Sequence, residues 1–106
     1  MPRNMRHISR EMVRDIINGT PSDIFDTHWL EQRLLRLHTV AFAEDLLEGR
    51  RDVDPLKSFS TAFAQWVDRQ FRGDIQQTTK VDSINLVGDP VSNQQWRKTH
   101  PETRIT

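Results

Sequence analysis

Apolar residues recur at helical spacing in three stretches of the first 72 residues, and this pattern stops after Gly73. The stretches cover residues 6–18, 27–48 and 54–72, and a glycine follows each of them. Apolar positions three or four residues apart form one face of an α-helix. The pattern therefore predicts a mainly α fold, a single small helical bundle of about four helices with a partly irregular C-terminal third.

The first helix is predicted to begin at Arg6 or Ser9 and to end at Asn18, because the next residue, Gly19, readily adopts the left-handed conformation that closes helices. The segment that follows, residues 20–23, has the form of a capping box with proline at the first helical position. It predicts a single short helical turn through Ile24 and Phe25.

The stretch over residues 27–48 allows two interpretations. The apolar spacing is continuous, which permits one long helix. We favour a break near His38 and Thr39, with Thr39 as a new cap, because two β-branched residues follow one another there. A helix of about 22 residues would also be long for a chain of this size.

The helix predicted after Asp54 and Pro55 has the most aromatic apolar face in the chain and ends at Arg72 and Gly73. With the earlier helices it defines an expected core. This core comprises Ile8, Met12, Ile16, Leu30, Leu34, Leu37, Phe42, Leu46, Phe59, Phe63, Val67 and Phe71.

The C-terminal third is polar and lacks helical periodicity. Residues 81–87 are rich in β-branched side chains and permit a short strand, and residues 88–90 form a turn signal. Residues 92–95 form a second capping box, which predicts a short helix near residues 93–99, followed by a frayed tail from Pro101. We therefore expect one domain over residues 1–106, with a helical core at 1–75 and a loop-rich segment at 76–106.

Composition narrows the possible functions. The 106 residues include 15 Lys and Arg, 15 Asp and Glu, and no cysteine. The absence of cysteine excludes disulfides, thiol catalysis and cysteine-based metal sites. A net charge of zero is unusual for a dedicated nucleic-acid binder and favours self-association. With no apolar run of membrane-spanning length and no apolar region after the basic N-terminus, we expect a cytoplasmic protein without a membrane partner.

The residues form no pattern typical of catalysis or of cofactor binding. The four histidines are scattered, so pairs such as His28 with Asp26 or Glu31, or His38 with Glu44, lack the further ligands that a metal needs. No serine lies in a nucleophile-elbow motif, and each of the four glycines follows a predicted element instead of forming a phosphate-binding loop. We predict no enzyme, no metal and no cofactor.

Two basic clusters support an alternative function. Four arginines at spacings of three and four residues would share one helical face, and the C-terminal segment adds two basic residues beside a tryptophan. A nucleic-acid-binding regulator would use these side chains on phosphates. They are Arg3, Arg6, Arg10, Arg14, Arg97 and Lys98. An ordinary solvated face is the other interpretation of the arginines.

The leading hypothesis comes from the aromatic residues. Three tryptophans and five phenylalanines exceed the need of a minimal bundle, and tryptophan is frequent at the centres of protein interfaces. Trp29, Trp66 and Trp96 are thus candidate interaction residues, with core packing as the alternative for each. We predict a small non-catalytic interaction or adaptor protein that forms homo-oligomers, such as a homodimer. No motif identifies a characterised family, although size and build are similar to small proteins of bacteria, phages and mobile elements.

Overall fold

The computed structural model describes residues 4–106 and contains four α-helices in this range. They are α1 (Arg10–Gly19), α2 (Thr27–Leu37), α3 (Thr39–Leu47) and α4 (Pro55–Gln70). Three of them begin after a residue whose side chain accepts a hydrogen bond from a backbone N–H in the first turn. These caps are Ser9, Asp26 and Asp54. Each cap satisfies a donor that the helix itself leaves unpaired.

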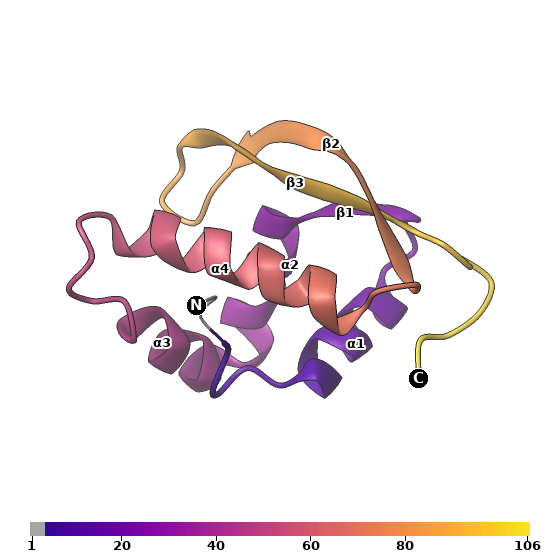
Figure 1. Ribbon diagram of the computed structural model, residues 1–106, viewed down its shortest axis with the longest axis horizontal. Helices are drawn as coiled ribbons and strands as arrows, with labels where there is room; N and C mark the ends of the chain where they lie inside the picture. Colours follow the sequence, from indigo (N-terminus) through magenta and orange to yellow (C-terminus); the bar gives the residue numbers. More distant parts are fainter. Residues whose placement is uncertain (1–3) are drawn as a thin grey trace.

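Three strands form an antiparallel sheet that covers one side of the helices (Figure 1). They are β1 (Ile24–Asp26), β2 (Ile75–Ile84) and β3 (Pro90–Lys98), in the order β1-β3-β2. β3 is thus the central strand, although it is the last to occur in the chain. The molecule has two layers, a sheet on a group of helices, which is an α+β architecture.

The prediction of a mainly α bundle is therefore wrong, and two of the segments that were predicted to be helical are strands. Ile24 and Phe25 form a strand paired with Arg97 and Trp96 instead of a helical turn. The segment predicted as a helix near residues 93–99 is most of β3. Both segments begin with residues that resemble helix caps, but pairing between residues about 70 positions apart in the chain decides their conformation. Strand formation depends strongly on such tertiary context.

The C-terminal third is also more regular than expected. β2 begins at Ile75, the last residue of the predicted helical core, and it continues through residues 76–80, predicted as part of the loop-rich segment, to Ile84. The predicted turn is confirmed, because residues 85–89 connect β2 to β3 and Gly88 has a positive φ of 90°. Glycine tolerates this conformation without a steric penalty.

The predicted break between α2 and α3 is confirmed, although its mechanism differs. His38 has φ −138° and ψ 57°, outside the helical range, and it ends α2 and precedes α3. Thr39 was expected to cap the new helix. Its hydroxyl instead donates to the carbonyl oxygen of Leu35 at 2.6 Å. A threonine hydroxyl that bonds four residues back competes with normal helix bonding and often accompanies a bend.

Most of the predicted core is buried. Of the predicted residues, Met12 and Leu46 are partly buried at its border, and Leu37 is wrong because 59% of it is exposed. The sequence pattern missed several buried side chains that lie in strands, near the N-terminus or on broader helix faces. These are Met5, Val13, Ile17, Phe25, Ala62, Trp66, Ile75 and Trp96.

Trp96 joins the sheet to the helices. It lies in the central strand, is completely buried, and its ring centroid is 5.8 Å from that of Phe25 on β1. Its indole N–H donates to Asp68 of α4 at 3.1 Å. A buried indole needs such a partner, because an unsatisfied N–H would be costly.

We expect Trp96→Ala to lower the free energy of unfolding by about 4 kcal/mol, since it removes a large buried side chain and leaves a cavity. Trp29→Ala, at a partly exposed tryptophan, serves as the control and should cost less than half as much. Urea denaturation followed by circular dichroism measures both values. Equal losses would contradict the central role of Trp96.

Candidate interaction site

The outer edge of β2 is the most distinctive surface of the sheet. β3 lies on one side of this ten-residue strand, and the described sheet ends on its other side. In Figure 1, β2 runs along the top of the molecule. An edge strand exposes a row of backbone donors and acceptors that another strand can use.

The pairing register shows which residues direct their backbone groups outward. Asn85 N–H donates to Asp89 O, and residues 81–84 continue this register opposite residues 90–93. Hydrogen-bonded and non-hydrogen-bonded pairs alternate along an antiparallel ladder. Val81 and Ser83 therefore bond to β3, whereas Lys80, Asp82 and Ile84 direct their N–H and C=O groups outward. Pro90, opposite Ile84, has no N–H to donate, which agrees with this assignment.

Part of this outer edge already has contacts. Gln32 Nε2 donates to the Ile84 carbonyl oxygen at 3.3 Å, and Thr79 Oγ1 lies 3.4 Å from the Lys80 carbonyl oxygen. Both distances are long for hydrogen bonds. Within residues 4–106, no hydrogen bond reaches the outer backbone groups of Asp82. A register shift between Gln77 and Lys80 limits the regular edge to residues 80–84.

A polar network fixes the helix-facing side of β2. His28, which is 4% exposed, places Nδ1 at 2.9 Å from Ser83 Oγ and at 3.1 Å from the Ser83 carbonyl oxygen. Asn93 Nδ2 donates to Ser83 Oγ at 3.0 Å, and Asn93 Oδ1 accepts the His28 backbone N–H. The start of α2 is thereby bonded to both long strands, which holds β2 in position.

The geometry of this network fits support of the fold better than catalysis. A carbonyl oxygen only accepts hydrogen bonds, so we infer that His28 Nδ1 carries the proton that faces Ser83. Serine activation requires the opposite arrangement, in which an imidazole nitrogen takes the hydroxyl proton. Ser83 Oγ also accepts from Asn93, so its lone pairs are engaged.

Glu31 of α2 is one of the two acidic residues that are buried in the described helices, and Asp45 of α3 is the other. The Glu31 carboxyl lies between α2 and α4. The Glu31 side chain is inaccessible to solvent and accepts from Ser60 Oγ of α4 at 2.5 and 3.1 Å. Burial, which disfavours the charged form, raises the pKa of the Glu31 carboxyl to about 7. The Ser60 hydrogen bond lowers this pKa and the negative charge of Asp26 raises it. Glu31 thus links α2 to α4.

The three candidate tryptophans lie in different environments. Trp66 and Trp96 are 5% and 0% exposed, so they offer almost no surface to a partner. Trp29 is partly exposed, and the guanidinium carbon of Arg33 lies 5.4 Å from its ring centroid.

Sequence analysis did not identify the β2 edge. The pattern that could have indicated this edge is the alternation of apolar and polar residues from Val81 onward, followed by the turn at residues 88–90, which together are typical of a hairpin.

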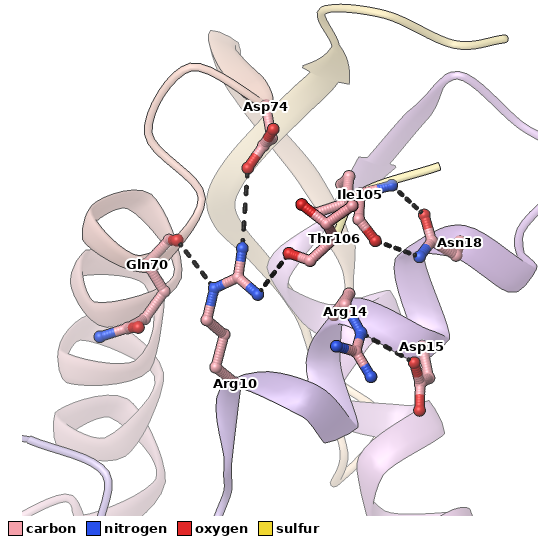
Figure 2. A network of polar contacts seen from close by, with 8 residues as sticks. All are labelled: Arg10, Arg14, Asp15, Asn18, Gln70, Asp74, Ile105 and Thr106. Atoms are coloured by element: carbon pink, nitrogen blue, oxygen red, sulfur yellow. Dashed lines mark hydrogen bonds and ion pairs between the residues drawn. The ribbon is translucent and has the colours of Figure 1, made fainter. Parts of the chain in front are cut away.

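Two of the candidate arginines on α1 are engaged within the molecule (Figure 2). Arg10 donates to the carbonyl oxygens of Gln70 and Thr106, and its guanidinium lies 4.8 Å from the Phe71 ring centroid. Arg14 forms an ion pair with Asp15 at 3.0 Å. Asn18 exchanges two hydrogen bonds with the Ile105 backbone, so the tail is attached to α1 instead of frayed.

The other basic candidates are dispersed. Arg6 and Arg97 are exposed, and Lys98 Nζ donates to the Thr20 carbonyl oxygen at 3.1 Å. Arg3 lies outside the described residues. Of the candidates that the structure describes, Arg6 and Arg97 are thus exposed, whereas Arg10, Arg14 and Lys98 are partly buried.

No protein-family model, curated protein or solved structure matched the chain. Within residues 4–106, no three metal-ligating side chains come together as a metal site. In the same range, no helix has both the length and the apolar character to cross a membrane.

We expect the stability of the protein to fall as the pH rises from about 4.5 to about 7, because folding keeps Glu31 protonated while the unfolded chain ionises. Glu31→Gln keeps an acceptor for Ser60 but cannot ionise. It should be more stable than the wild type at pH 8, by up to about 3 kcal/mol, and this advantage should vanish below pH 4.5. Urea denaturation at several pH values measures the difference.

The matched control is Glu48→Gln at an exposed position, which should show no comparable pH-dependent advantage. A stability difference between Glu31→Gln and the wild type that stays constant with pH would show that Glu31 titrates normally.

Proposed function

We propose that this protein is a non-catalytic interaction protein that binds a partner polypeptide by adding a strand to the outer edge of β2. The observation that carries the proposal is the outward direction of the Lys80, Asp82 and Ile84 backbone groups on a strand at the sheet edge. Strand addition uses such groups for affinity and uses side chains for specificity.

The surroundings of β2 support this proposal. The His28, Ser83 and Asn93 network anchors the strand from the helix side, so the outer edge is held in an extended conformation before a partner binds. A preorganised edge loses little conformational freedom on binding. A net charge of zero places no general repulsion between this chain and a neutral partner.

The nucleic-acid alternative receives less support from the structure. Arg10 and Arg14 would have to leave carbonyl and carboxylate partners before they could bind phosphate. Arg6 and Arg97 are the described candidates on exposed positions without a side-chain ion pair among the residues that the structure covers. We therefore favour a polypeptide partner.

Asp82→Pro tests the proposal, because proline removes one outward N–H and its ring obstructs an incoming strand. Proline is tolerated on an edge strand when the lost N–H faces solvent, so the variant should fold. Random peptides displayed on phage and selected on the wild-type protein should bind Asp82→Pro at least about ten-fold more weakly. Titration of synthetic versions of the selected peptides measures this change.

Val53→Pro, in the exposed loop between α3 and α4, introduces the same residue away from the edge and should bind the peptides as the wild type does. Circular dichroism verifies that both variants are folded. If a folded Asp82→Pro variant binds all selected peptides with unchanged affinity, the binding surface lies elsewhere and the proposal is wrong.

A further inference from the structure

We infer that the strand that fits the β2 edge is β2 of a second copy of this chain, antiparallel and related by a two-fold axis through Val81. This inference rests on the proposed function and identifies the partner. It follows from the order of charged residues along the exposed edge, where Lys80 and Asp82 flank Val81.

The charges select one register. In an antiparallel pair centred on Val81, Lys80 of each copy lies directly opposite Asp82 of the other. Opposite charges at such positions attract, and like charges repel. Centring the pair on Lys80 places two lysines opposite each other, and centring it on Asp82 does the same with two aspartates. Of these three registers, the one centred on Val81 alone places opposite charges face to face.

The backbone geometry suits the same register. Lys80 and Asp82 both direct their N–H and C=O groups outward, so each Lys80–Asp82 pair can exchange two hydrogen bonds. The two-fold axis repeats this exchange, which gives four backbone hydrogen bonds and two ion pairs in a self-complementary interface. Both charged side chains are exposed and free of any ion pair within residues 4–106, so pairing disrupts no existing salt bridge.

The expected dimer is weak and reversible. The register shift before Lys80 and the Gln32 contact at Ile84 confine regular pairing to a few residues. An interface of this size belongs to the transient class. Open-ended growth is not expected, because a two-fold interface closes on itself and the other edge strand of the described sheet, β1, has only three residues.

Charge exchange at the edge provides the first test. Lys80→Glu and Asp82→Lys should each raise the dimer dissociation constant about ten-fold or more, since each substitution creates two repulsive pairs per dimer. The double variant that carries both substitutions restores attraction and should regain dimerisation. An equal mixture of the two single variants should form heterodimers, in which both pairs are complementary. Sedimentation over a range of concentrations measures all four samples.

Lys57→Glu is the matched control, because it makes the same charge change at an exposed position on α4 and should dimerise as the wild type does. A dimer that is insensitive to the edge substitutions, or a double variant that stays as weak as the single ones, would overturn the inference.

Val81→Cys provides a second test, because the chain has no cysteine of its own. Val81 faces its own copy across the axis at a non-hydrogen-bonded position, where the Cα atoms lie about 4.5 Å apart, within disulfide range. Mild oxidation should produce a covalent dimer. Thr61→Cys, exposed on α4, should stay monomeric under the same conditions.

A wild-type protein that is monomeric at the highest attainable concentration, with no disulfide from Val81→Cys, would overturn self-pairing. If the selected peptides still bind Asp82→Pro more weakly than they bind the wild type, the partner strand comes from a different polypeptide. The proposed strand addition at the β2 edge would then be retained. If peptide binding is also unchanged by Asp82→Pro, the proposed function itself is wrong.

Discussion

Pairing of β3 on both of its sides is the constraint on which the rest of this structure depends. β1 lies on one side, through Ile24, Phe25 and Asp26, and β2 lies on the other. Because β3 occupies the centre, Trp96 is covered by the helices, and β2 must lie at an edge. The core and the candidate interaction site therefore have a common origin in the position of the last strand of the chain.

The helical layer could be predicted from sequence because its signals are local. Ser9, Asp26 and Asp54 lie directly before helices that their side chains cap, and the apolar spacing identified most of the buried residues. The break at His38 was also foreseeable, from β-branched residues that weaken a helix. Leu37 failed as a core residue because this break changes the direction of the chain immediately after it.

The sheet could not be predicted in the same way, because its stability comes from contacts between distant residues. Residues 92–95 resemble a helix start, and residues 76–80 are polar with no periodicity. Residues 92–95 are extended because β3 pairs with β1 and β2 and Trp96 is buried, and residues 76–80 are extended because β2 pairs with β3. The candidate site depends on this topology. In the sequence, Lys80 and Asp82 are ordinary charged residues, and no local pattern places them on the open edge of a sheet.

Amide hydrogen exchange resolved by residue tests the central claim most directly, since it reports which backbone groups of β2 are bonded and which are free. In dilute solution, the amides of Lys80, Asp82 and Ile84 should exchange rapidly, whereas those of Val81 and Ser83 should be protected by β3. At high concentration, Lys80 and Asp82 should gain protection. Rapid exchange at Val81 and Ser83, or protection of Asp82 that is already complete in dilute solution, would contradict an open β2 edge.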